Sequence, residues 1–88
     1  MHHFSPCLRD LISYRESVNH MTYRERLRNL REDRDLTQAQ VATVINKSQQ
    51  GYSHIESGRA ELKIDDLILL CRFYGVSADY LIGLKDNK

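Results

Sequence analysis

Residues 37–57 read TQAQVATVINKSQQGYSHIES, and two short helical patterns follow each other within this segment. Thr37 and Gln40 have the spacing of a capping box, in which each side chain accepts a hydrogen bond from a backbone N–H group of the other residue. The apolar residues that follow recur at helical spacing. Together these features predict a first helix over 38–45.

The second pattern begins only three residues later. Asn46 tolerates the left-handed backbone conformation that a sharp turn requires, and Ser48 offers the side-chain oxygen of a helix N-cap. A second helix is therefore expected over 49–56, and Gly58 is placed to end it. Two short helices joined by a three-residue turn have the spacing of a helix-turn-helix unit, which we place at 38–57.

The second helix has two faces of different chemistry. Tyr52 and Ile55 are three residues apart and are expected to face the core. In a helix-turn-helix unit the N-terminal half of this helix enters the major groove of DNA, where a glutamine can form two hydrogen bonds with adenine. The candidates for reading DNA bases are the hydrogen-bonding side chains of the outward face, Gln49, Gln50, Ser53 and His54.

A polar helix face can also be merely hydrated, which is the more common explanation for an arbitrary helix. Exposed faces usually carry Lys and Glu, however, and this face is nearly uncharged. Two adjacent glutamines and Gly51 are also poor choices for helix stability alone. Gly51 could instead permit close approach to DNA, so a binding face is favoured over a hydrated one.

Helical patterns continue on both sides of the unit. Thr22 and Glu25 predict a second capping box that starts a helix with Leu27 and Leu30 facing inward. Beyond the unit, a loop at 59–63, a helix over 64–74 and a helix capped by Ser77 that ends near Ile82 are expected. The other faces of the helix that starts at Thr22 are expected to carry Arg24, Arg26, Arg28, Arg31 and Arg34.

The N-terminal part of the chain has its own pattern. Ser5 and Pro6 are typical of a helix start, and apolar residues at near-helical spacing predict a short amphipathic helix over 6–18. The chain of 88 residues has room for one domain. We divide it into an N-terminal extension (1–21), a helix-turn-helix domain (22–84) and a C-terminal tail (85–88).

The helix over 64–74 carries more apolar residues than one inward face needs. Leu69 and Phe73 are four residues apart and share a face. An exposed apolar pair usually marks a contact. The pair either packs against the N-terminal helix or joins a dimer interface with Tyr80 and Leu84, and we hypothesise that the N-terminal helix supports dimerisation.

Residues 27–84 resemble the Cro and phage-repressor type of helix-turn-helix DNA-binding domain, also called the XRE family. The resemblance covers about two-thirds of the chain, and its motifs include L-T-Q at 36–38, Ile55-Glu56 and G-V-S-x-D-x-L at 75–81. It implies an all-α, five-helix lambda-repressor-like domain, to which the chain adds the N-terminal helix. It also implies a homodimeric transcriptional regulator, such as a repressor, that binds double-stranded DNA.

The resemblance assigns roles to individual residues. Gln38 matches a position whose side chain contacts a DNA phosphate, and Arg31 and Glu56 match a structural ion pair between two helices. Tyr52 departs from the pattern because it stands where the family has a smaller aliphatic residue. Three further cations are candidate phosphate contacts: Lys47, Arg59 and Lys63. For these residues, a side chain that is simply hydrated at the surface is an equal alternative.

The charge of the chain is nearly balanced, with 13 Lys and Arg against 12 Asp and Glu. This excludes a binder that works by bulk positive charge. Residues 24–63 carry eight Lys and Arg against six Asp and Glu, so even the binding half is barely basic. Modest non-specific affinity and a shallow salt dependence are therefore expected.

Other classes of protein find little support. No apolar run is long enough to span a membrane, and two cysteines do not make a disulfide framework, so a cytoplasmic location is expected. The four histidines lack metal-ligand spacing, and no catalytic constellation or phosphate-binding loop is present. We expect neither an enzyme nor a metal or other cofactor.

The sequence therefore predicts a transcriptional regulator, most simply a repressor that acts sterically on a two-fold operator as a homodimer. An alternative is an antitoxin-like or regulatory subunit whose helical domain binds a partner protein as well as DNA, a role that the N-terminal extension would favour. A third hypothesis is a structural dimeriser that does not read DNA.

Overall fold

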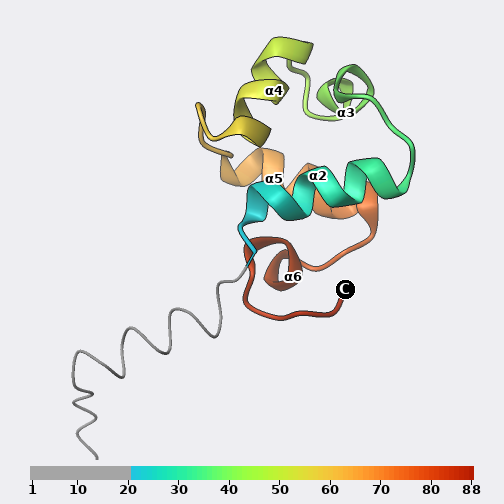
Figure 1. Cartoon of the computed structure of the whole chain (residues 1–88), viewed down its shortest axis with the longest axis vertical. Coiled ribbons are helices and arrows are strands. Elements are labelled where there is room, and N and C mark those ends of the chain that lie inside the picture. The colour runs from blue at the N-terminus through green and yellow to red at the C-terminus, as the bar shows by residue number, and fades with distance from the viewer. Residues whose placement is uncertain (1–20) are drawn as a thin grey trace, which may run out of the picture.

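The computed structural model describes residues 21–88, which form five α-helices and no strand (Figure 1). The all-α class and the five-helix domain are as predicted, whereas the helix expected over 6–18 lies outside the described residues. None of the described helices is long and apolar enough to cross a membrane. The five helices are α2 (Tyr23–Asp33), α3 (Gln38–Val44), α4 (Gln49–Ser57), α5 (Ile64–Tyr74) and α6 (Ala78–Ile82).

The helix starts follow from local side-chain chemistry. At the start of α3 the predicted capping box is complete: the Gln40 N–H donates to Thr37 Oγ1 at 3.1 Å, and the Thr37 N–H donates to Gln40 Oε1 at 2.8 Å. At the start of α2 only half of the box forms, because the Thr22 hydroxyl donates to the Glu25 carboxylate instead. Lys63 precedes α5 without a side-chain cap.

Positive φ angles mark the turns that follow α2, α3 and α4. Asn46 has φ 57° after α3, and Gly58 has φ 89° after α4, as their residue types predict. Asp35 has φ 54° after α2, which was not anticipated. Aspartate is among the few residues that visit this region with little strain, so all three turns are chemically explained.

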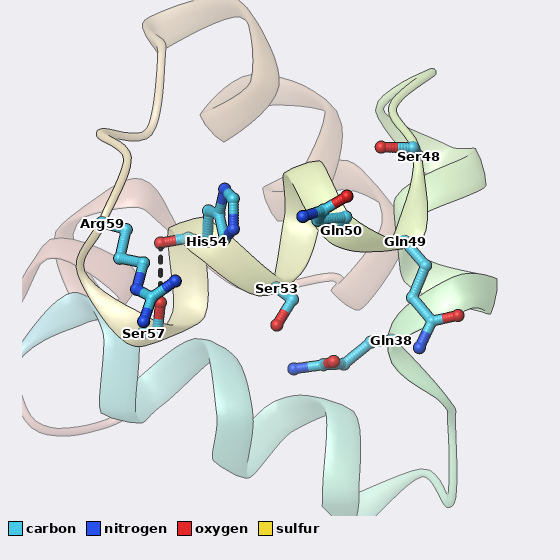
Figure 2. A pocket seen from close by; sticks show the side chains of 8 residues that line it. All are labelled: Gln38, Ser48, Gln49, Gln50, Ser53, His54, Ser57 and Arg59. Atoms are coloured by element: carbon cyan, nitrogen blue, oxygen red, sulfur yellow. Dashed lines mark hydrogen bonds between the residues drawn. The ribbon is translucent and has the colours of Figure 1, made fainter.

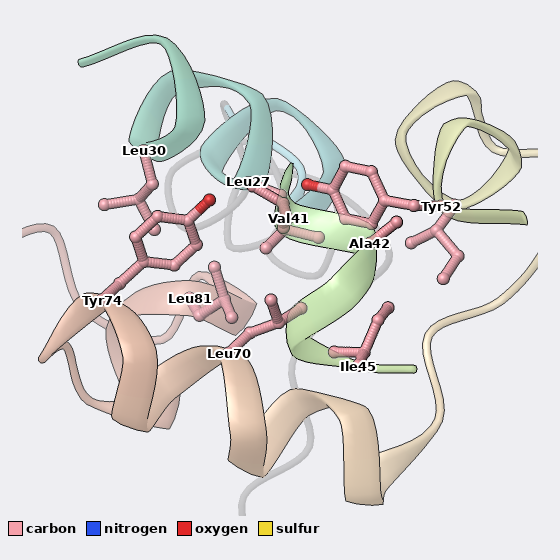
Figure 3. Close-up of a cluster of buried hydrophobic side chains, with 10 residues drawn as sticks. Leu27, Leu30, Val41, Ala42, Ile45, Tyr52, Leu70, Tyr74 and Leu81 are labelled. Carbon is pink, nitrogen blue, oxygen red and sulfur yellow. The ribbon is translucent and has the colours of Figure 1, made fainter. Parts of the chain in front are cut away.

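The buried core lies where α2 crosses the molecule, with α3 and α4 on one side of it and α6 on the other (Figure 1). Tyr52 reaches from α4 into this core and is fully buried (Figure 3). Because Tyr52 and Ile55 are both buried, as predicted, the rotation of α4 about its axis is set. The core comprises Leu27, Leu30, Val41, Ala42, Ile45, Tyr52, Ile55, Leu70, Tyr74 and Leu81.

Arg26 corrects one expectation, because it was placed on an outer face and is instead buried. Its guanidinium lies 4.7 Å from the centroid of the Tyr80 ring and donates to the Lys85 carbonyl oxygen at 3.4 Å. One Nη atom is also 3.6 Å from the Asp86 carboxylate. The planar, weakly hydrated guanidinium can be buried against an aromatic ring, which a helical pattern alone does not indicate.

Candidate nucleic-acid interface

The outward face of α4 lies in an open depression of about 760 Å³ (Figure 2). Its lining is almost entirely hydrogen-bonding side chains with one cation. The lining residues are Gln38, Ser48, Gln49, Gln50, Ser53, His54, Ser57 and Arg59.

The depression brings together six of the eight residues selected from the sequence. Two predicted phosphate contacts, Lys47 and Lys63, do not line it. Two serines line it that sequence reasoning missed. Ser48 is the N-cap that begins α4, and Ser57 is one helical turn beyond Ser53, so periodicity along the same face would have indicated it.

The burial of Tyr52 and Ile55 determines which side chains reach the depression. With these two in the core, Gln49 and Gln50 are exposed, and Ser53 and His54 are half-buried. Gln38 extends from α3 toward Ser53 (Figure 2). The polar groups of two helices are thereby presented on one surface.

Gln38 is held by a buried carboxylate. Its Nε2 donates to Glu56 Oε1 at 3.1 Å, and the Glu56 side chain is almost fully buried. Glu56 also accepts two hydrogen bonds from Arg31, at 2.8 and 3.1 Å, which is the helix-to-helix ion pair that the resemblance implied. The link from Gln38 to this pair was not predicted, and it restricts the orientation of the Gln38 amide.

The ionisation of Glu56 follows from these contacts. Burial by itself raises the pKa of the Glu56 carboxyl, but the hydrogen bonds from Arg31 and Gln38, the nearby Tyr52 hydroxyl and the charge of Arg31 together hold that pKa below its ordinary value. Glu56 is therefore a carboxylate at neutral pH. Its negative charge faces the partners within the protein rather than the open depression.

Lys47 has a structural partner. Its Nζ is 3.5 Å from Oδ2 of Asp66, a buried residue in the first turn of α5. The Lys47 side chain also passes near Gly51, where an added Cβ would lie 3.3 Å from Ser48 Oγ and 3.7 Å from Lys47 Cβ. The absent side chain of Gly51 thus leaves room for the turn before α4, and Gly51 does not line the depression.

The chemistry of the depression suits hydrogen bonding to a ligand. Amides offer both donors and acceptors, hydroxyls do the same, and the Arg59 guanidinium supplies a positive charge. These are the groups that contact base edges and phosphates in DNA complexes. Among residues 21–88 no group of three or more His, Cys, Asp or Glu side chains is placed to hold a metal ion.

Comparison with known proteins gives three matches and one negative result. Residues 27–81 match the family described as helix-turn-helix. The chain is 38% identical over 65 residues to the uncharacterized HTH-type transcriptional regulator YobD of Bacillus subtilis (strain 168), covering 74% of this chain and 58% of that protein.

A second relative comes from the same organism. The SPbeta prophage-derived uncharacterized HTH-type transcriptional regulator YonR is 34% identical over 58 residues, which cover 66% of this chain and 54% of that protein. The matched region thus spans somewhat more than half the length of each relative. No solved structure matches the chain significantly.

Proposed function

The chain belongs to the XRE-type helix-turn-helix family, and on that premise we propose that it is a transcriptional regulator that binds double-stranded DNA through α4. The observation that carries the proposal is the outward face of α4. It gathers neutral hydrogen-bonding side chains in one open depression, where an ordinary exposed helix would carry Lys and Glu.

Base recognition is assigned to the exposed part of this face. Gln49 and Gln50 are in the first turn of α4, the end that enters the major groove in such motifs. Ser53 and His54 follow one turn later and line the same depression. A glutamine can form two hydrogen bonds with the major-groove edge of adenine, so the pair can distinguish adenine from the other bases.

Phosphate contact is assigned first to Gln38 and Arg59, which flank the base-reading residues in the depression. Gln38 keeps one amide hydrogen for a phosphate while its other hydrogen is held by Glu56. Lys47 and Lys63 remain candidates outside the depression. Lys47 has the weaker support because Asp66 is already its partner.

A homodimer is the assembly we propose, with repression by steric occlusion of a two-fold operator in the cytoplasm. Leu69 and Phe73 are 37% and 40% exposed, and Leu84 is 70% exposed, so an apolar surface remains available on α5 and after α6. Tyr80 is half-buried and covered by Arg26, so it contributes only in part. Dimerisation would place two α4 helices roughly 34 Å apart, one turn of DNA.

A partner protein is the competing occupant of the same apolar surface, as in an antitoxin-like subunit. Light scattering of the purified chain distinguishes the two, because a homodimer has twice the chain mass without any partner. A variant lacking residues 1–20 tests whether the N-terminal extension supports dimerisation, and an unchanged dimer would contradict that hypothesis. A chain that is monomeric alone and forms a complex only with a co-purified, unrelated protein would favour the antitoxin-like alternative.

The central experiment is selection of bound sites from random double-stranded DNA, followed by gel shifts at two salt concentrations. We expect one enriched sequence with two-fold symmetry that remains bound above competitor DNA. Binding that is equal for all sequences and abolished by salt would contradict sequence-specific regulation.

A further inference from the structure

On the basis of the proposed function, we propose that Arg24 and Arg28 of α2 extend the DNA interface as phosphate-binding side chains beside the C-terminal end of α4. Neither lines the depression of Figure 2, and neither was selected from the sequence. Their position beside α4 and the weak pairing of their guanidinium groups point to this role.

Arg28 carries a charge that its neighbour does not neutralise. Its Nε is 3.8 Å from Glu56 Oε1, beyond hydrogen-bonding distance, and half of its side chain is exposed. The same Glu56 oxygen already accepts hydrogen bonds from Arg31 and Gln38. One carboxylate between two guanidiniums leaves one positive charge in excess, and the exposed guanidinium of Arg28 presents it.

Arg24 is one helical turn before Arg28 and shares its face of α2. Its side chain runs along Gly58, where an added Cβ would lie 3.3 Å from Arg24 Nε. Its guanidinium carbon is 4.5 Å from the centroid of the Tyr23 ring, and its buried Nε has no hydrogen-bond partner among the described residues. A guanidinium already held by stacking loses less conformational entropy when it binds a phosphate.

Arg24 adjoins the depression through Gly58, because the neighbouring residues Ser57 and Arg59 both line it. Arg28 lies beside Glu56, so it and Arg24 are both near the C-terminal end of α4, which Arg59 follows in the chain. Glu25 and Glu32 are three residues before and four residues after Arg28 on α2, but neither forms an ion pair with it among residues 21–88. Three guanidinium groups are therefore present at this end of the interface, although the whole chain carries a net charge of only +1.

The test compares Arg24→Gln, Arg28→Gln and the double variant with Arg72→Gln, which removes an equal charge from the exposed side of α5. Affinity is measured over a range of salt concentrations for the selected site and for unrelated DNA of the same length. Each single variant is expected to weaken both DNAs by a similar factor and to reduce the slope of log affinity against log salt by about 0.9. The double variant should lose about twice that slope, and Arg72→Gln should lose none.

Charge-retaining variants separate phosphate binding from a structural role. Arg24→Lys and Arg28→Lys should keep most of the salt slope, because a lysine also neutralises a phosphate. A folded double Gln variant with the parent slope would overturn the phosphate role while leaving DNA binding by α4 intact. A parent chain that binds neither DNA would instead overturn the proposed function, and the phosphate role with it.

Discussion

Arg31 and Glu56 join α2 to α4 through two hydrogen bonds, from Arg31 Nε to Glu56 Oε2 at 2.8 Å and from Arg31 Nη2 to Glu56 Oε1 at 3.1 Å. Gln38 Nε2 donates to the same Oε1 at 3.1 Å. The ion pair therefore does more than join two helices. It orients an amide that lines the candidate interface, so the Glu56 carboxylate both joins the two helices and positions a side chain of the site.

Replacing Arg31 by Met should destabilise the fold strongly. Glu56 has a side chain that is 1% exposed, and loss of its bidentate partner would leave a buried charge with little compensation. We expect a loss of roughly 3–5 kcal/mol in the free energy of unfolding, measured by urea denaturation. Arg28→Met is the control, because that half-exposed arginine should cost less than about 1 kcal/mol. Equal losses in the two variants would refute the structural importance of the pair.

The same pair predicts a dependence of stability on acid pH. The pKa of Glu56 in the folded protein lies below its ordinary value of 4.5. A carboxyl of this kind stabilises the fold above its unfolded pKa, and this contribution is lost as the pH falls through the folded pKa. Glu56→Gln lacks the contribution at every pH. The difference in unfolding free energy between parent and variant should thus narrow as the pH falls below about 4.5, and a constant difference would contradict this.

Tyr74 predicts a change at the alkaline end. Burial, with the nearby Glu56 carboxylate, raises the pKa of its phenol to about 12, and its hydroxyl has no hydrogen-bond partner among residues 21–88. Tyr74→Phe should cost little at neutral pH, because no hydrogen bond is lost. Above its ordinary pKa of 10, the parent loses stability as the unfolded phenol ionises, and the variant is spared this loss. Thermal denaturation of parent and variant between pH 9 and 11 tests this. An equal loss of stability in both proteins over this range would contradict the effect of burial on Tyr74.

Local chemistry explains why much of this fold could be predicted from the sequence. The capping box of Thr37 and Gln40 and the left-handed turn at Asn46 are properties of adjacent residues, and both are present as expected. Tyr52 was also placed correctly in the core, since one helical face had to be buried.

Long-range pairings could not be predicted in this way. Gln38 and Glu56 are 18 residues apart, and Lys47 meets Asp66 only because α3 packs against α5. The burial of Arg26 likewise depends on Tyr80, a residue of α6 whose ring packs against the Arg26 guanidinium. Six of the predicted site residues meet, because helix spacing places four of them on one face of α4. Of the other two predicted residues, Lys47 pairs with Asp66 and Lys63 lies outside the depression.

Arg59 and Lys47 were selected from the sequence for the same phosphate role, and the structure makes them unequal. Arg59 is exposed in the depression, whereas Lys47 is paired with Asp66. Arg59→Gln should reduce the salt slope of DNA binding by about 0.9, and Lys47→Gln should leave it nearly unchanged. The Lys47 variant should instead lose up to about 1 kcal/mol of stability. Equal loss of salt slope in both variants would show that Lys47 leaves Asp66 to bind DNA.

Gln49 provides the most direct test of base reading, because it is exposed in the first turn of α4 and lines the depression. Gln49→Ala should cost about 1–3 kcal/mol on the selected site and relax the base preference at one position of each half-site. Asn29→Ala is the matched control, since it removes an exposed amide from α2 outside the depression. The selected site and an unrelated duplex are compared for both variants. Equal weakening on the two DNAs would make Gln49 a backbone contact, and parent affinity on the selected site would remove it from the interface.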